Sequence, residues 1–289
     1  NALGYYDFLA LISTYNTKYQ GYVKGNGDNA WAGSIARGLE NRSLKWETTD
    51  TKNIGLDFGF FNNKLTGAMN YYYNQTEELL ITKALPPSAG LNNPILNVGK
   101  IRNSGVEVEI NWADSKGGFD YNIGMNFSTT KNKVVELADK GQVLYGEGLK
   151  YGTEHFPTQT RVGKPIGAFY LYKTNGLFQN NEEARQYVNA DGDEYQPFAD
   201  AGDIRFVDVN GDGSIDDDDK VYCGSGIPTL EVNLNFSAGY KGFDLSVVLG
   251  SAWGHKIYNG NKYFYEGMNS GSNFLTSSLN AWTPQNTNT

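Results

Sequence analysis

Cysteine, histidine and long apolar runs are scarce or missing in this chain of 289 residues. The single cysteine, Cys223, rules out a framework of intrachain disulfides, and we assign it no role. The two histidines, His155 and His255, lie about a hundred residues apart, which is not the spacing of a zinc site. The formal net charge of −8 argues against a nucleic-acid partner, because binding to phosphates needs a basic face. These absences exclude a disulfide scaffold, a zinc site and a nucleic-acid-binding protein.

The sequence has no run of 18 or more apolar residues and so no transmembrane helix. The strands of a membrane β-barrel alternate and never produce such a run, so a membrane protein of that kind is still possible. The 35 glycines, 20 tyrosines and 15 phenylalanines, without a long helical pattern, indicate an all-β protein. No signal peptide opens the chain, and it stops in WTPQNTNT, so we expect an internal piece of a longer protein.

Three segments predict β-hairpins: Asn53–Asn74, Gly105–Ser128 and Thr229–Trp253. Their predicted turns are Asn62–Lys64, Asp114–Gly118 and Gly239–Gly242. Along each arm apolar residues alternate with polar ones, as in Leu230, Val232, Leu234 and Phe236 against Glu231, Asn233, Asn235 and Ser237. Because side chains on a strand alternate between faces, each hairpin is a ribbon with one apolar and one polar side.

The connections between the hairpins are long, whereas the turns within them are short. Roughly 30 residues run from Gln75 to Ser104 and about 100 from Thr129 to Pro228. Short turns at one end and long loops at the other are typical of an outer-membrane barrel, with the apolar rows on lipid and the polar rows on a wet lumen. Alternation alone also fits a secreted soluble β-sandwich that binds calcium and carbohydrate, and this alternative stays open. A sandwich would cover the apolar rows with a second layer of the same polypeptide.

The segment 208–219, DVNGDGSIDDDD, matches the twelve-residue calcium loop. Spacing by two lets one tight loop aim alternate side chains inward, and Gly213 supplies the sharp turn at the sixth position. The predicted ligands are Asp208, Asn210, Asp212, the backbone carbonyl of Ser214, Asp216 through water, and Asp219. Short extended segments flank the loop in place of helices, so we expect a structural Ca²⁺ that pins a long loop; an acidic turn without metal is the alternative.

Catalytic constellations are missing from the sequence. It contains no GxSxG elbow and no paired Cys and His, so no catalytic residue and no enzymatic activity are predicted. Glu107 and Glu109 share one strand face, but they read as lumen-facing polar residues and not as a glycosidase pair. Within the long connection, Asn181–Tyr187 predicts a short helix capped by Asn180 or Asn181, and Ala168–Tyr172 predicts a strand.

Several segments, taken in order, resemble the C-terminal barrel portion of the SusC/RagA family, the TonB-linked outer-membrane transporters of Bacteroidota. They are Lys45–Thr49 (KWETT), Asn53–Asp57 (NIGLD), Asn97–Glu107 (NVGKIRNSGVE), Val162–Tyr170 (VGKPIGAFY), Gly176–Gln179 (GLFQ), Gly202–Gly213 (GDIRFVDVNGDG) and Ala281–Pro284 (AWTP). Each segment is weak evidence by itself, whereas the ordered set covers nearly the whole chain from about Leu44 onward.

The resemblance implies that residues 1–289 are part of a large antiparallel transmembrane barrel of about 22 strands, without the plug and the final strands. Thr129–Pro228 would be a long extracellular loop region that carries the calcium-type loop. The whole protein would sit in the outer membrane lipid of a Gram-negative cell and import glycans or oligopeptides. Its partners would be a SusD-like surface lipoprotein and the TonB complex, which would act through an N-terminal region that this chain lacks.

Overall fold

The computed structural model describes residues 9, 12–15, 22–23, 30–31, 33–36, 38–83, 85, 87–146, 156–267 and 273–287. The chain divides into two compact units. Unit 1 consists of Asn1–Gln142, Arg161–Pro165 and Thr229–Trp253. Unit 2 consists of Val143–Thr160, Ile166–Pro228 and Gly254–Thr289. No helix among the described residues is long and apolar enough to cross a membrane.

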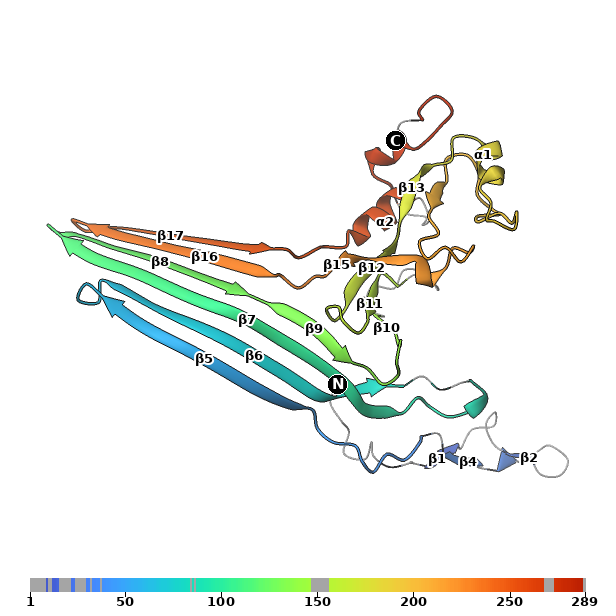
Figure 1. Ribbon diagram of the computed structural model, residues 1–289, viewed down its shortest axis with the longest axis horizontal. Coiled ribbons are helices and arrows are strands. Elements are labelled where there is room, and N and C mark those ends of the chain that lie inside the picture. The colour runs from blue at the N-terminus through green and yellow to red at the C-terminus, as the bar shows by residue number, and fades with distance from the viewer. Residues whose placement is uncertain are drawn as a thin grey trace. The chain divides into compact units, whose positions relative to one another are not determined.

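Unit 1 is built on one seven-stranded antiparallel sheet (Figure 1). Its strands are β5 (Thr48–Phe60), β6 (Leu65–Thr82), β7 (Ile95–Lys116), β8 (Phe119–Thr129), β9 (Lys131–Glu136), β16 (Leu230–Tyr240) and β17 (Phe243–Trp253). They lie in the order β17-β16-β8-β7-β6-β5, and β9 continues from β8 along the far part of β7. Two smaller pairs, β1 (Ile12–Tyr15) with β4 (Gly33–Ala36) and β2 (Tyr22–Val23) with β3 (Ala30–Trp31), precede it.

The three tight turns lie at the same end of this sheet (Figure 1). Gly117-Gly118 and Lys241-Gly242 are two-residue turns in which both residues have positive φ, the backbone that matches the twist of paired strands. The first hairpin turns through Phe61, Asn62 and Asn63, also with positive φ. All three predicted hairpins are therefore confirmed. The turns begin one residue earlier than predicted in the first hairpin, three residues later in the second and two residues later in the third. β8 also pairs with β16, so the chain returns to the same sheet after about 100 residues.

β6 and β7 are longer than the sequence pattern indicated. They contain 18 and 22 residues, and the connection predicted over Gln75–Ser104 shrinks to the segment 83–94, which holds the 3-10 turn Pro87–Ala89. The pairing continues past a register shift between Thr76 and Leu79. At this bulge Glu78 has a φ of 57°, its carboxylate pairs with Lys45 at 3.0 Å, and its carbonyl accepts from the Asn97 amide at 2.9 Å. These contacts replace the ladder bonds that the bulge interrupts.

The register sorts the side chains of the sheet into apolar and polar rows. One row joins Phe58, Gly67, Ile110, Met125, Leu234 and Leu249, and the next joins Phe60, Leu65, Trp112, Ile123, Phe236 and Val247. The alternate rows are polar, for example Asp57, Ala68, Glu109, Asn126, Asn233 and Gly250. The predicted two-sided ribbon is thus one continuous surface across six strands.

The apolar rows are exposed and not buried under a second layer of described residues. Ile54, Leu56 and Leu249 are 76%, 64% and 57% exposed. The buried apolar side chains described in unit 1 are Leu80, Val134 and Leu137, at the end where the long connections leave. The sandwich alternative requires a covering sheet, and the described residues do not provide one.

Unit 2 holds two small antiparallel sheets. The first has the order β10 (Leu144–Tyr145), β11 (Thr158–Thr160), β12 (Ala168–Tyr172) and β15 (Lys220–Gly224). The second pairs β13 (Thr174–Leu177) with β14 (Ile204–Phe206). The helices are α1 (Asn181–Gln186), α2 (Gly260–Glu266) and two 3-10 turns, Asp217–Asp219 and Thr276–Asn280. The segment Thr129–Pro228 is therefore largely folded, and the predicted strand Ala168–Tyr172 and capped helix are confirmed.

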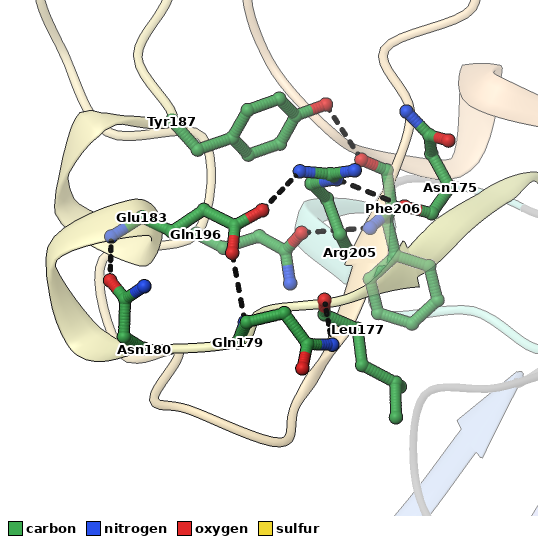
Figure 2. Close-up of polar contacts among 9 residues, drawn as sticks. All are labelled: Asn175, Leu177, Gln179, Asn180, Glu183, Tyr187, Gln196, Arg205 and Phe206. Carbon is green, nitrogen blue, oxygen red and sulfur yellow. Dashed lines mark hydrogen bonds and ion pairs between the residues drawn. The ribbon is translucent and has the colours of Figure 1, made fainter. Parts of the chain in front are cut away.

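A partly buried ion pair joins α1 to the paired strands β13 and β14 (Figure 2). Arg205 Nη1 lies 2.6 Å from Glu183 Oε1, and Arg205 Nε donates to the Asn175 carbonyl. Glu183 Oε2 accepts from the backbone amide of Gln179, while Asn180 caps the helix by accepting from the Glu183 amide. Beside them a small core forms from Phe178, Ala184, Ala199 and Tyr187. Unit 2 thus has its own packing and is not a structureless link.

Candidate functional sites: a polar sheet face, an acidic loop and an aromatic cavity

The polar face of the main sheet carries mainly acids and amides, with Lys64 at the turn end, where it pairs with Asp114 at 2.7 Å. Its carboxylates are Asp57, Glu107, Glu109, Asp120, Glu231 and Asp244. Glu107 and Glu109, predicted to lie on one face, border a hollow of about 310 Å³ together with Asn70, Asn126 and Asn233. A surface of this kind offers many hydrogen-bond acceptors to a hydrated solute. It suits contact with water and polar ligands.

The residues predicted to bind calcium come together in one compact loop. Asp208 Oδ1 and Oδ2 accept from the backbone amides of Gly211 and Gly213 at 2.6 and 2.9 Å, which closes the turn. Partial desolvation acts to raise the pKa of Asp208, but these amide bonds outweigh it and hold the pKa below its ordinary value. Asn210 Oδ1 and Asp212 Oδ1 accept from the amides of Asp212 and Ser214.

The far side of the loop is closed by Asp219, whose side chain is fully buried. Its carboxylate accepts from the amides of Val209, Asn210 and Asp216, at 2.7, 3.3 and 2.8 Å. Asp216 caps the short 3-10 turn that follows. No group of three or more His, Cys, Asp or Glu side chains within the described part of the chain converges as a metal site. The loop supplies the predicted oxygens, but in this conformation backbone amides engage many of them.

Unit 2 contains an aromatic cavity that no pattern in the sequence predicted. It has a volume of about 290 Å³ and is lined by the rings of Phe156, Tyr170, Tyr172, Phe206, Tyr258 and Tyr263, with Lys220 in its wall. These residues come from β12, β14, β15, α2 and the segments before β11 and α2. Because they are separated by up to 107 positions, no local pattern in the sequence unites them.

Lys220 provides a charged group in the wall of this cavity and pairs with Asp217. The Lys220 side chain is 4% exposed, and its Nζ lies 2.5 Å from Asp217 Oδ1 and 5.1 Å from the centre of the Tyr172 ring. The hydroxyls of Tyr172 and Tyr145 donate to the same carboxylate at 3.3 and 3.2 Å. Burial, followed by the charge and hydrogen bond of Asp217, raises the pKa of Tyr172 to about 12. The tyrosine is therefore neutral over the physiological range.

The remaining sequence predictions concern single residues. Cys223 is an exposed free thiol, and His155 lies outside the described residues. His255, in the segment that follows β17, has a buried Nδ1 without a hydrogen-bond partner among the described residues. Neither histidine was assigned a function, and this geometry gives none.

Comparison with known proteins gives consistent results. The family model described as TonB dependent receptor-like, beta-barrel, matches residues 4–200. TonB-dependent receptor P3 of Formosa agariphila is 31% identical over 282 residues, which cover 96% of this chain and 27% of that receptor. TonB-dependent receptor SusC of Bacteroides thetaiotaomicron is 27% identical over 281 residues, covering 94% of this chain and 25% of SusC.

The fold matches solved structures as well. A structure of the RagAB peptide transporter superposes with a TM-score of 0.72 at 22% identity, covering 99% of this chain and 29% of the solved chain. RagAB in an open-open state gives a TM-score of 0.71 at the same identity. The chain thus spans about a quarter of the length of the curated relatives it matches. None of these named relatives is an enzyme, which agrees with the predicted lack of catalysis.

Proposed function

This chain belongs to the TonB-dependent receptor β-barrel family, and from that premise we propose that it forms part of the wall of a nutrient importer. The family consists of outer-membrane proteins, so the predicted recognition, the barrel fold class and the outer-membrane location are confirmed. In this proposal the apolar rows contact lipid and the polar rows line a hydrated lumen. The imported cargo is a glycan or an oligopeptide too large for passive diffusion.

The observation that carries the proposal is the exposed apolar surface, which has the height of a membrane. From Phe243 to Trp253 the strand advances ten residues, or about 34 Å at about 3.4 Å per residue. Tilted by about 35–45°, such a strand spans about 24–28 Å, close to the apolar band of about 25 Å in outer-membrane barrels. Aromatic residues stand at both ends of β17, as the interfacial girdles of such barrels do.

The placement of the turns supports an orientation. Short turns of outer-membrane barrels face the periplasm and long connections face outside. The tight turns at Gly117-Gly118 and Lys241-Gly242 would then be periplasmic. Unit 2, whose segments follow β9 and β17 in the sequence, would be extracellular. A SusD-like lipoprotein would meet the protein on that outer side, and the TonB complex would act through the N-terminal part of the longer protein. The solved structure described as a peptide transporter is the reason for keeping oligopeptides as cargo. The resemblance to the SusC/RagA family is the reason for keeping glycans.

The decisive experiment uses the full-length protein in its native cell. The outer-membrane fraction should contain a species that migrates faster on a gel before boiling than after it, as folded barrels do. Growth on the oligomeric nutrient should stop when either this protein or TonB is deleted. A protein that remains soluble without detergent and shows no heat-dependent migration would contradict the proposal and favour the soluble calcium-binding alternative.

We also propose that the loop 208–219 binds Ca²⁺ as a structural ion. Support comes from its spacing of oxygen donors: Asp208, Asn210, Asp212, the Ser214 carbonyl, Asp216 and Asp219. Binding would require Asp219 to exchange its amide contacts for the ion. Calorimetry should detect Ca²⁺ binding that Asp208→Ala with Asp212→Ala abolishes. The control is Asp191→Ala with Asp193→Ala, which removes two carboxylates from a neighbouring turn outside the loop. Equal binding by both double variants would remove the site.

A further inference from the structure

We propose that a basic cluster beside the apolar rows of unit 1 binds the phosphate of an anionic lipid headgroup. The cluster consists of Lys52 on β5, Arg102 on β7, and Lys131 and Lys133 on β9. The three lysines are exposed and Arg102 is partly buried. This inference rests on the proposed barrel wall and names a lipid that one end of that wall binds. All four residues belong to unit 1, so the cluster does not depend on how the two units are placed.

The register places the cluster on the same face of the sheet as the apolar rows. Lys52 lies two residues before Ile54 on β5, and Arg102 lies four residues before Val106 on β7, and even spacing keeps side chains on one face of a strand. One row joins Lys52, Tyr73, Ser104 and Lys131, and the next joins Asp50, Gln75, Arg102 and Lys133. The cluster therefore continues the surface assigned to lipid and does not belong to the polar face.

The two rows of the cluster lie at the depth of lipid headgroups. The last apolar row before them contains Ile54, Tyr71 and Val106. Because two residues of a tilted barrel strand rise by about 5 Å, the row of Lys52 lies about 5 Å beyond that apolar row and the row of Arg102 about 10 Å beyond it. A headgroup layer is about 5–8 Å thick on each side of the hydrocarbon core. Long lysine and arginine side chains bridge the remaining distance.

The cluster holds more positive charge than its neighbours balance. Three of its four cations make no ion pair among the described residues; the exception is Lys52, whose Nζ lies 3.7 Å from Asp50 Oδ2. The row beyond contains Lys100, Glu77 and Glu136, and there Glu77 pairs with Lys100 at 3.0 Å. With four cations against one carboxylate, the two rows of the cluster carry a formal charge of +3, in a chain whose net charge is −8. This local excess favours an anion with more than one negative charge.

The contacts of Arg102 favour a phosphate as that anion. Its Cζ lies 5.1 Å from the centre of the Tyr73 ring, and its Nη2 donates to Gln75 Oε1 at 3.2 Å. Its buried Nε has no hydrogen-bond partner among the described residues, and a guanidinium fork matches the oxygens of a phosphate. Lys52 Nζ lies 5.9 Å from the same ring, so two cations flank one aromatic side chain. An acidic protein surface would also offer negative charge, but it would not extend the apolar rows into a headgroup layer.

The test is native mass spectrometry of the full-length protein in a zwitterionic detergent. The probes are phosphatidic acid, phosphatidylcholine with the same acyl chains, and inorganic phosphate. Phosphatidic acid should bind more tightly than phosphatidylcholine, and an equal concentration of inorganic phosphate should not displace it. Arg102→Gln with Lys133→Gln should weaken the binding of phosphatidic acid by about 30-fold, since each cation near an anionic lipid contributes about fivefold. Arg102→Lys with Lys133→Arg keeps both charges and should retain most of the affinity.

The matched control is Lys116→Gln with Lys241→Gln, which removes two cations from the turn end of the same sheet. It should leave the affinity unchanged. The proposal is overturned if phosphatidic acid binds no more tightly than phosphatidylcholine, if the two glutamine double variants have equal effects, if inorganic phosphate displaces the lipid, or if a polyglutamate peptide binds more tightly than the lipid.

Heat-dependent gel migration of the same samples separates these outcomes from a failure of the proposed barrel wall. A protein that migrates as a folded barrel but shows no preference for phosphatidic acid loses the headgroup site alone. A protein without heat-dependent migration contradicts the wall itself.

Discussion

Replacing Leu234 with arginine places a charge near the centre of the surface that we assign to lipid. Leu234 lies on β16 between Met125 of β8 and Leu249 of β17, and it is 36% exposed in a sheet without a covering layer. An arginine at the midplane of the lipid face of such a barrel costs about 2–4 kcal/mol. Since about 1.4 kcal/mol is a factor of ten, the ratio of folded to unfolded protein should fall by about 30- to 1,000-fold.

Two matched variants make the measurement specific. Asn235→Arg changes the next residue, whose side chain lies on the polar face opposite Gly124 and Val248, and it should cost less than about 1 kcal/mol because the charge stays in water. Phe243→Arg lies on the apolar face at the end of β17, where the charge should cost about 0–1 kcal/mol. Urea unfolding of the full-length protein in phospholipid vesicles, followed by gel migration, supplies the free energies. Equal costs for Leu234→Arg and Asn235→Arg, or the same cost at both depths, would refute the lipid assignment.

Three further predictions concern local structure. Tyr172 has a pKa of about 12 in the folded protein, against an ordinary value of 10.0. The stability that its neutral form contributes is therefore present below pH 10 and is lost as the pH rises towards 12. In an ultraviolet titration, Tyr172→Phe should remove one phenol that ionises late. Arg205→Met should lower the free energy of unfolding by about 1–3 kcal/mol, because it leaves the partly buried Glu183 without its cation. A double-mutant cycle with Glu183→Gln should give a coupling energy of about 0.5–3 kcal/mol between the two side chains. Gly118→Val should cost at least about 1 kcal/mol in urea unfolding, since φ is +79° there, and Gly118→Asn should cost less.

The hairpins could be predicted because alternation by two and turn residues report directly on strand pairing. Asn62, Asn63 and the glycines of the other turns adopt the positive φ that their residue types favour. The turn edge at Phe61 could not be predicted, since an aromatic residue rarely adopts positive φ. The register across the whole sheet follows once the apolar rows must share one face.

The ends of the strands are harder to predict from the sequence, because local contacts interrupt the alternation of apolar and polar residues. The bulge around Glu78 shifts the pattern by a residue, so the extension of β6 and β7 beyond it does not read as a strand. In unit 2 the strands have two to five residues, too few for a period of two to be visible. The long connection was predicted as a loop region for that reason, although its strand at Ala168–Tyr172 and its helix were recognised.

The candidate sites also differ in how far the sequence alone predicts them. The acidic loop is contiguous, so its residues and their approach to one another follow from spacing alone. The aromatic cavity depends on the pairing of β12 with β15 and on the position of α2, which bring Tyr172, Lys220 and Tyr263 together from distant parts of the chain. Such sites arise from tertiary structure, and a single sequence does not encode them in any local pattern.

Spin-label accessibility along β17 tests directly whether the apolar rows contact lipid. Single cysteines at 243–253, introduced into full-length protein carrying Cys223→Ser, are labelled in phospholipid vesicles and exposed to oxygen or to a water-soluble nickel chelate. If the apolar rows face lipid, accessibility should alternate with a period of two. Labels at Phe243, Leu245, Val247 and Leu249 should be accessible to oxygen, and labels at Asp244, Ser246 and Gly250 to the chelate. A strand protected from oxygen at the odd positions, or one without alternation, would contradict the assignment of the apolar rows to lipid.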